Sequence, residues 1–187
     1  MIYFLDNFIQ NETLKKLDNH LNNFKEIDTG EKKFWVMDVP QNILSAFLDK
    51  ISLVEGRRIE NVLSMFRISD PERDNSWRIH CDSIIMNQRP KRTAIFYISK
   101  TKIKDIHGTA FWKHNKYGDT LLEKNTTEDI YNNLLKYDAE DLNKWKLQTI
   151  VGYKRNRLLS FPCNYFHSKY PNKSWEEGRK ILVIFYK

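Results

Sequence analysis

Cysteine is scarce in this sequence: Cys81 and Cys163 are its two examples among 187 residues. Two cysteines cannot build the disulfide framework that holds many small secreted domains together. We therefore expect both thiols to be free, as in a reducing cytoplasm, and we expect a cytoplasmic location.

Long apolar runs are absent as well. No stretch of 18 apolar residues occurs, so we expect no membrane span. The opening stretch "MIYFLDNFIQNETLKKL" has no basic start and no cleavable apolar segment, so we expect no signal peptide. The sequence also has no internal repeat, low-complexity tract or linker. Its length suits one domain better than two, and we expect a single domain over residues 1–187.

Apolar residues make up 41% of the chain and aromatic residues 13%, which is enough to fill a globular core. The formal charge is +7, spread over short clusters such as "NQRPKR" (87–92) and "GYKRNR" (152–157). A basic surface attracts nucleic acids, acidic proteins or anionic substrates. A solvated surface is the simpler interpretation, because no basic helix or arginine-rich tail is present.

Hydrophobic spacing predicts two amphipathic helices, over residues 11–25 and 41–54. The chain then changes character after Glu55, and most of the remainder is rich in β-branched and aromatic residues. We expect helical support in residues of about 1–60 and a β core in about 61–187, a mainly β fold of jelly-roll type. The predicted strands are 1–8, 33–39, 61–69, 76–84, 92–99, 108–115, 147–153, 156–162, 164–170 and 179–187, with 126–146 helical or irregular.

One predicted strand contains "WRIHCDSII" (77–85), in which His80 and Asp82 stand two residues apart. Two residues is the side-chain period of a strand, so His80 and Asp82 share one face and Cys81 points to the other. His167 lies on a later predicted strand. Two histidines and one carboxylate form the facial triad of non-haem Fe(II) oxygenases, which leaves three iron positions open.

Four blocks of the chain resemble, in order, the Fe(II)/2-oxoglutarate-dependent dioxygenases, most closely their prolyl-hydroxylase-like branch. The resemblance covers about two thirds of the chain, from Val62 to Lys187, and implies a double-stranded β-helix, or jelly roll. The blocks are "SWRIHCD", "RTAIFYIS", "HGTAFWKH" and "RLLSFPCNYFHSKYP…GRKILVIFYK".

The resemblance implies a role for five residues. His80, Asp82 and His167 would bind Fe(II). Arg179 would hold the distal carboxylate of 2-oxoglutarate, because a guanidinium matches a carboxylate bidentately, and Tyr97 would add a hydroxyl hydrogen bond. Dioxygen would be the oxidant, ascorbate is a candidate reductant, and the products would be a hydroxylated substrate, succinate and carbon dioxide.

This chain departs from the family pattern in several places. The segment "HGTAFWKH" has one glycine where the family has two, and the spacing from His167 to Arg179 is longer than usual. Val183 stands where a threonine or serine is common. An upstream tyrosine near the cosubstrate is missing, and we expect Ile68 in its place. Lys180 should face away from Arg179 on the strand.

Other residues receive simpler interpretations. We expect His107 in a turn and His20 on the surface. His114 is interpreted as a surface residue, with a place at the substrate entrance as the second interpretation. The polar segment 69–76 is expected to form a loop and a lid over the iron. Trp77 and Trp112 either wall the site or pack in the core.

Several substrate classes are compatible with the sequence. A peptide or protein, hydroxylated on proline or a related residue, is our leading hypothesis. A nucleic-acid demethylase is suggested by the charge, but that branch carries a second arginine where this chain has Phe185. A small-molecule hydroxylase of the same superfamily is a third hypothesis, and a non-catalytic jelly-roll binding module is a fourth.

Overall fold

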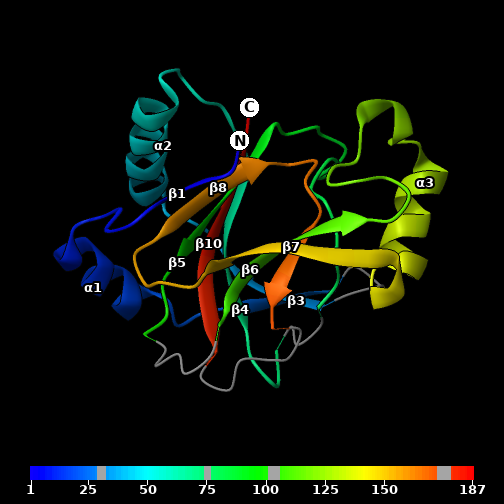
Figure 1. Cartoon of the computed structure of the whole chain (residues 1–187). Helices are drawn as coiled ribbons and strands as arrows, with labels where there is room; N and C mark the ends of the chain where they lie inside the picture. Colours follow the sequence, from blue (N-terminus) through cyan, green and yellow to red (C-terminus); the bar gives the residue numbers. More distant parts are fainter. Residues whose placement is uncertain (29–32, 74–76, 101–105, 172–177) are drawn as a thin grey trace.

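The computed structural model describes the chain except for residues 29–32, 74–76, 101–105 and 172–177 (Figure 1). Two antiparallel sheets form its centre. A seven-stranded sheet has the order β1-β8-β5-β10-β4-β3-β2, and a three-stranded sheet has the order β7-β6-β9. The strands are β1 Tyr3–Leu5, β2 Lys25–Asp28, β3 Lys33–Met37, β4 Asn61–Ser69, β5 Arg92–Tyr97, β6 Gly108–His114, β7 Trp145–Gly152, β8 Leu158–Pro162, β9 His167–Tyr170 and β10 Arg179–Tyr186.

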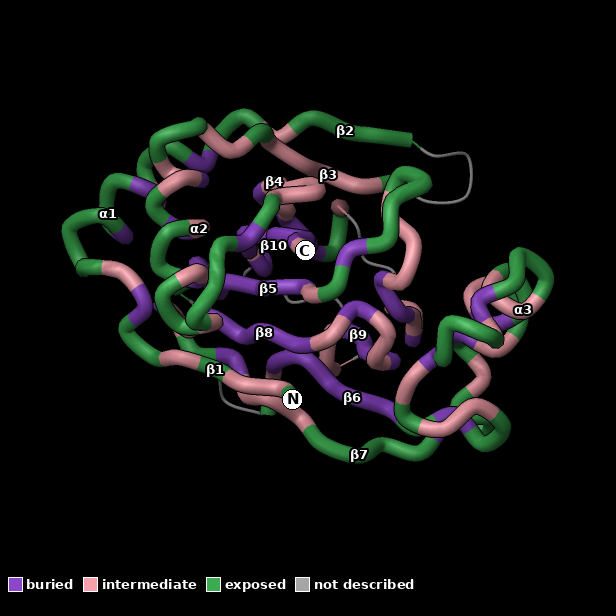
Figure 2. Tube along the Cα trace, turned by 90° about the horizontal axis from the view of Figure 1, so that it is seen from above, coloured by how far each residue is buried: buried purple, intermediate pink, exposed green. Residues whose placement is uncertain are grey.

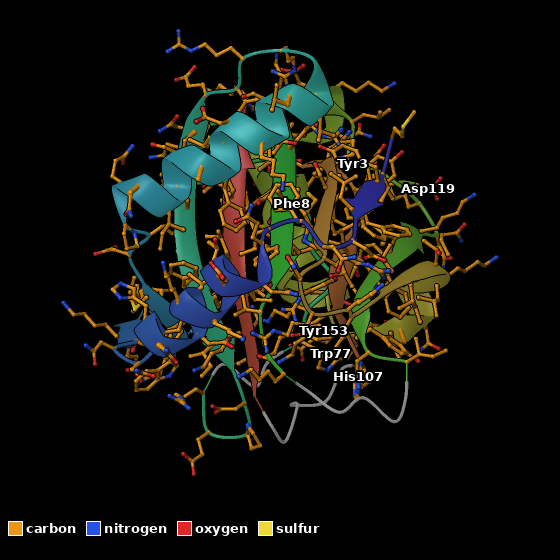
Figure 3. All side chains as sticks on the ribbon, turned by 90° about the vertical axis from the view of Figure 1, so that its left-hand side faces the viewer. Tyr3, Phe8, Trp77, His107, Asp119 and Tyr153 are labelled. Carbon is orange, nitrogen blue, oxygen red and sulfur yellow. The ribbon has the colours of Figure 1, made fainter. Side chains whose placement is uncertain are left out.

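Helices cover one face of the larger sheet, and Figure 3, viewed from that face, shows them in front of the strands. The helices α1 (Asn11–His20) and α2 (Gln41–Glu55) bury one apolar stripe each against it. Phe8, Phe47 and Phe96 meet in this layer, with ring centroids 5.0 to 6.1 Å apart. Burying aromatic side chains contributes most of the stabilisation of such a core.

The opposite face of the larger sheet packs against the smaller sheet. Phe161 of β8 meets Phe111 of β6 edge-on, with ring centroids 5.1 Å apart. The central strands β5, β8 and β10 are buried almost throughout, whereas the edge strands β2 and β7 are largely exposed (Figure 2). Two facing antiparallel sheets confirm the predicted mainly β, jelly-roll class.

The predicted strand over 76–84 is wrong. Its described residues, from Trp77 on, form no strand, and a single bridge joins His80 to His167. The reason is that successive amides bond to different parts of the chain. The amide of Ile79 donates to Ala139, and that of Asp82 donates to Cys163. A segment shared among several partners cannot form a continuous ladder with one of them.

The first predicted helix is also shorter than expected. It ends at His20, and Lys25–Asp28 becomes the edge strand β2. The prediction of helical or irregular structure over 126–146 is confirmed up to Lys144, and β7 begins at Trp145. The short helices between β6 and β7 are η1 Glu123–Asn125, α3 Glu128–Asn133, the π-helix η2 Leu134–Asp138 and η3 Leu142–Lys144, and we call residues 123–144 the helical insert. Among the described residues, no helix is both long and apolar enough to cross a membrane.

Candidate metal centre

His80, Asp82 and His167 come together between the two sheets. One possible ligand atom from each lies within 4.8 Å of the others. The Nε2 atom of His80 is 3.7 Å from Oδ1 of Asp82, and Nε2 of His167 is 3.4 Å from Oδ2. Asp82 and His167 are buried, while the His80 side chain is 34% exposed. The cluster is therefore open on the side of His80.

Hydrogen bonds orient both imidazoles. The Nδ1 atom of His80 lies 2.8 Å from the carbonyl oxygen of Arg78, and Nδ1 of His167 lies 3.0 Å from that of Tyr165. A carbonyl oxygen only accepts, so we assign the imidazole proton to Nδ1 in each ring. This leaves the Nε2 lone pairs directed toward Asp82, which is the arrangement that metal-binding histidines adopt.

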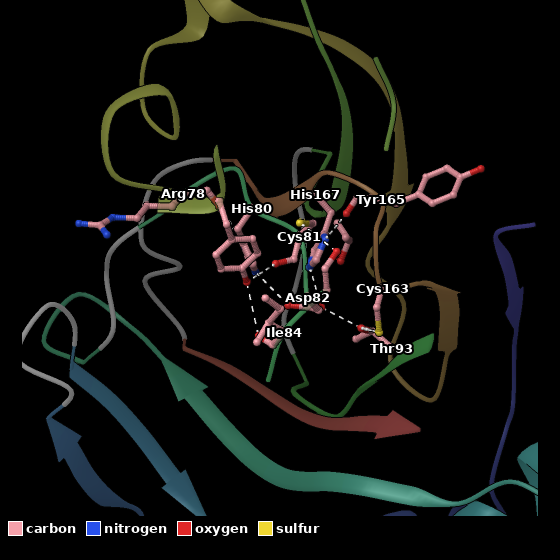
Figure 4. A network of polar contacts seen from close by, with 12 residues as sticks. Arg78, His80, Cys81, Asp82, Ile84, Thr93, Cys163, Tyr165 and His167 are labelled. Carbon is pink, nitrogen blue, oxygen red and sulfur yellow. Dashed lines mark hydrogen bonds and ion pairs between the residues drawn. The ribbon is translucent and has the colours of Figure 1, made fainter. Parts of the chain in front are cut away.

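A hydrogen bond from Thr93 of β5 orients the carboxylate of Asp82 (Figure 4). The sequence analysis did not predict this role of Thr93. The Thr93 hydroxyl donates to Oδ2 of Asp82 at 2.8 Å and lies 3.2 Å from the Cys163 sulfur. The amide of Asp82 also donates to the Cys163 carbonyl at 2.7 Å. The sequence signal was weak, because threonine is common in strands and an inward position alone does not reveal its partner.

Cys81 points away from the cluster, as predicted. It packs in an apolar group with Ile79 and Phe166. Burial raises the pKa of the Cys81 thiol to about 11, so it stays protonated at neutral pH. A thiol with this pKa does not compete as a thiolate ligand.

Arg179 lies in the same cavity as the three candidate ligands. The cavity measures about 80 Å³, and Arg179 is buried in its wall. The Arg179 guanidinium carbon is 5.7 Å from the ring centre of Tyr97. The Tyr97 hydroxyl shares a 2.7 Å hydrogen bond with Thr109, which lines the cavity, although Tyr97 itself is not among the described lining residues. Burial raises the pKa of Tyr97, so its hydroxyl remains a donor.

The larger sheet corrects one expectation, on Ile68, and confirms another, on Lys180. Ile68 does not take the place of the missing tyrosine: on β4 it is Arg67 and Ser69 that line the cavity, and Ile68 is buried on the other face. Val183 lines the cavity. Lys180 faces away and donates from Nζ to the carbonyl of Leu21 at 2.9 Å.

The expected surface position of His114 is wrong, since its side chain is only 3% exposed. Its Nδ1 accepts from the amides of Lys116 and Tyr117 at 3.1 and 3.3 Å, and its Nε2 lies 3.2 Å from Oδ2 of Asp138. A neutral ring with its proton on Nε2 satisfies all three contacts. Burial lowers the pKa of His114 despite the Asp138 carboxylate. His114 is therefore a structural residue that ties β6 to the helical insert.

The two tryptophans of the sequence analysis have different positions in the fold. Trp77 lines the cavity, whereas Trp112 is buried and donates from its indole nitrogen to Ser168 at 2.9 Å. His107 precedes β6 outside regular structure. Within the proposed lid, residues 70–73 form a turn closed by the Asp70 side chain, and residues 74–76 lie outside the described residues. The long segment between His167 and Arg179 likewise falls mostly on the undescribed residues 172–177.

Comparison with known proteins gives matches in structure only. No protein-family model and no curated protein sequence matches this chain. HygX from Streptomyces hygroscopicus, solved with nickel, 2-oxoglutarate and hygromycin B, is similar with a TM-score of 0.64 and 11% identity, over 99% of this chain and 82% of HygX. A Burkholderia pseudomallei oxidoreductase of the 2OG-Fe(II) oxygenase family is similar with a TM-score of 0.60 and 11% identity, over 100% of this chain and 85% of that one.

The chain has the fold of the Fe(II)/2-oxoglutarate oxygenases. Prolyl hydroxylases are among the similar structures. A Pseudomonas putida prolyl-4-hydroxylase has a TM-score of 0.58 and 11% identity, over 100% of this chain and 91% of its own. Identities this low establish the fold, and the chemistry has to be argued from the residues of the site itself.

Proposed function

We propose that this chain is an Fe(II)- and 2-oxoglutarate-dependent oxygenase that hydroxylates its substrate. The observation that carries the proposal is the convergence of two Nε2 lone pairs and one carboxylate within 4.8 Å. Imidazole and carboxylate on one face suit Fe(II) and leave open positions. The donor set, with its proton-bearing Nδ1 atoms turned outward, therefore fits the metal that the fold implies.

Each residue has one task in this proposal. His80, Asp82 and His167 hold the iron, and Thr93 fixes the Asp82 carboxylate. Arg179 is the anchor for the distal carboxylate of 2-oxoglutarate, because it lies buried in the cavity wall. When bound, iron with 2-oxoglutarate and dioxygen supplies the oxidising chemistry that converts a C–H bond to C–OH with release of succinate and carbon dioxide.

Tyr97 assists this anchor in the proposal. Its ring lies against the Arg179 guanidinium, and its hydroxyl bonds to Thr109 at the cavity wall. In the proposal Tyr97 therefore positions Arg179 and Thr109, which both line the cavity. Ascorbate would serve as a reductant that keeps the iron in the ferrous state.

For the substrate we propose a proline-containing peptide or protein. The similarity to a prolyl-4-hydroxylase supports this choice, as does the sequence resemblance to that branch. Phe185 lines the cavity at the position where nucleic-acid demethylases carry a second arginine, which disfavours an oligonucleotide. A small-molecule substrate is the second candidate, because HygX was solved with hygromycin B bound.

The test is succinate formation from 2-oxoglutarate with Fe(II), ascorbate and air. Proline-containing peptides and methylated oligonucleotides are each supplied at low and at physiological salt, with Asp82→Ala protein as the inactive control. Stimulation by peptides supports the proposal. Stimulation by oligonucleotides alone, with the steep salt dependence of counterion release, would exclude the peptide substrate. Stimulation by neither addition would favour the second candidate, a small-molecule or free amino-acid substrate. A protein that does not bind Fe(II) would exclude the oxygenase itself.

A further inference from the structure

Cys163 lies in the turn between the two sheets, directly after β8 and four residues before His167. It is buried, with 2% of the residue exposed. Burial raises the pKa of the Cys163 thiol, and the nearby Asp82 carboxylate raises it further, so the sulfur keeps its proton at neutral pH. Cys163 therefore carries a buried S–H donor close to a candidate metal ligand, and the proposed function gives this donor no task.

The main chain fixes where this thiol lies. The Cys163 carbonyl accepts the amide of Asp82 at 2.7 Å, and the Cys163 amide donates to the carbonyl of Lys91 at 3.0 Å. Lys91 immediately precedes β5, the strand that carries Thr93. Cys163 is thus held between the segment of a candidate ligand and the strand of the residue that orients this ligand.

The direction of the side-chain hydrogen bonds follows from a count of protons. The Thr93 hydroxyl oxygen lies 2.8 Å from Oδ2 of Asp82 and 3.2 Å from the Cys163 sulfur. An ionised carboxylate, the form that binds a metal, only accepts, so it takes the single proton of the Thr93 hydroxyl. The Thr93 oxygen then accepts from the thiol. Cys163 therefore donates to Thr93, which donates to Asp82, and Figure 4 shows the three side chains next to one another.

These two hydrogen bonds run in the same direction and strengthen each other, because a hydroxyl that accepts a hydrogen bond becomes a better donor. Both Thr93 and Cys163 are buried, and a buried hydrogen bond is electrostatically stronger than one in water. In the part of the chain that the structure describes, Thr93 is the one hydrogen-bond partner of the Cys163 sulfur. The thiol also restricts rotation of the hydroxyl, which has to accept from sulfur while its proton points at the carboxylate.

We propose that Cys163 is a positioning residue for the metal centre, whose thiol acts through Thr93 to orient the Asp82 carboxylate. In this role Cys163 touches neither the metal nor the substrate. The inference rests on the proposed oxygenase function, since it assigns a task toward the metal that this function requires. It also gives the two cysteines of the chain different roles, because Cys81 makes no contact of this kind.

Cys81 provides a matched control for the test. It is buried to the same degree as Cys163 and is next to Asp82 in the sequence. Its sulfur, however, packs with Ile79 and Phe166 and accepts a 3.4 Å hydrogen bond from the Ser83 hydroxyl. Changing either cysteine to alanine removes the same atom from a buried position, so both variants lose packing. Only the variant at position 163 loses a hydrogen bond directed toward the carboxylate.

Mn(II) serves as a stable substitute for Fe(II), and its affinity is measured by calorimetry. We expect Cys163→Ala to bind Mn(II) about 3–10-fold more weakly than the wild type, because Thr93 then orients the carboxylate less firmly. Cys163→Ser keeps a donor and should recover most of the affinity. Cys81→Ala should bind Mn(II) within about 2-fold of the wild type, even where urea denaturation shows a similar loss of stability. Equal losses of affinity in the two alanine variants would assign the effect to packing and overturn the proposal.

A double variant tests whether the thiol acts through Thr93. In a Thr93→Val background the hydroxyl is gone, so adding Cys163→Ala should cause no further loss of Mn(II) affinity. Losses that multiply would overturn the proposal. A wild type that binds no Mn(II) would overturn the proposed function, and the role of Cys163 with it. A wild type that binds Mn(II) no better than Cys163→Ala would overturn the role of Cys163 alone.

The infrared S–H stretching band gives a readout that needs no metal. This band lies apart from the other absorption bands of a protein, and it moves to lower wavenumber when the thiol donates a hydrogen bond. Difference spectra against Cys163→Ala and Cys81→Ala assign one band to each thiol. In Thr93→Val we expect the Cys163 band to move to higher wavenumber while the Cys81 band stays in place. An unmoved Cys163 band would show that the thiol does not donate to Thr93, and the proposal would fail.

Discussion

His80 and His167 are joined through their backbones by two hydrogen bonds, one in each direction. The amide of His80 donates to the carbonyl of His167 at 3.0 Å, and the amide of His167 donates to that of His80 at 2.8 Å. The bridge holds the two rings with their centroids 4.4 Å apart. Because the main chain sets this spacing, the pair is arranged for a metal before one binds, which lowers the reorganisation that binding requires.

Removing a ligand should remove the metal. We expect Asp82→Ala and His167→Ala to lose stoichiometric Mn(II) binding and all succinate formation, while circular dichroism stays unchanged. His20→Ala, which changes an exposed histidine at the end of α1, is the control and should behave as the wild type. Calorimetry of Mn(II) binding checks the result, and full metal affinity in His167→Ala would show that the ligand set is different.

Loss of the Thr93 hydroxyl should weaken the metal site without touching a ligand. Thr93→Val keeps the shape of the side chain but removes the hydrogen-bond donor to Asp82. Losing a residue that holds a metal ligand in place typically costs about 10–100-fold in metal affinity. Thr93→Ser retains the hydroxyl and should restore most of the affinity. Equal Mn(II) affinity in the valine and serine variants would show that the Thr93 hydroxyl is not needed to orient the Asp82 carboxylate.

Arg179→Ala should weaken 2-oxoglutarate binding by about 1.5–3 kcal/mol, because a charge-assisted pair is lost. Tyr97→Phe should cost less, about 0.5–1.5 kcal/mol, the value of a neutral hydrogen bond. Calorimetric titration of the Mn(II)-loaded proteins with 2-oxoglutarate measures both. Lys180→Ala serves as the neighbouring control, since Lys180 faces the helices. If Lys180→Ala lost affinity and Arg179→Ala did not, the anchor would have to be reassigned.

Stability should fall in mild acid because of His114. Burial lowers its pKa in the folded protein below the ordinary value of about 6.5. The unfolded chain then binds the proton more readily, so the free energy of unfolding decreases as pH falls below about 6.5 and on through the folded-state pKa. In His114→Gln the decline between pH 7 and pH 5, followed by urea denaturation, should be shallower. An unchanged slope would assign the acid sensitivity to other groups.

The sequence predicted the residues of the candidate site better than the structure around them. His80 and Asp82 could be proposed from their two-residue spacing, whereas Arg179 was proposed only through the resemblance of its sequence block to the Fe(II)/2-oxoglutarate dioxygenases. The irregular path of residues 77–84 could not be predicted from the sequence. It depends on backbone acceptors at Ala139, Cys163 and His167, which only the folded chain brings together.

Two further residues show the same limit. The burial of His114 follows from where the helical insert places Asp138, and no local pattern encodes that. Arg67 was missed through an error of one residue: side chains alternate along β4, so assigning Ile68 to the cavity face reversed the strand.

The helical insert also has a consequence for the dynamics of the metal site. Ala139 accepts the amide of Ile79, and the Tyr131 hydroxyl donates to the carbonyls of Cys81 and Ile84 at 3.3 and 3.4 Å. Opening the 77–84 segment therefore breaks contacts with the insert, and the two should open as one cooperative unit. A metal that binds only the closed form raises the free energy of that opening. Amide hydrogen exchange should then slow in the insert, which supplies no ligand, as much as it slows at His80.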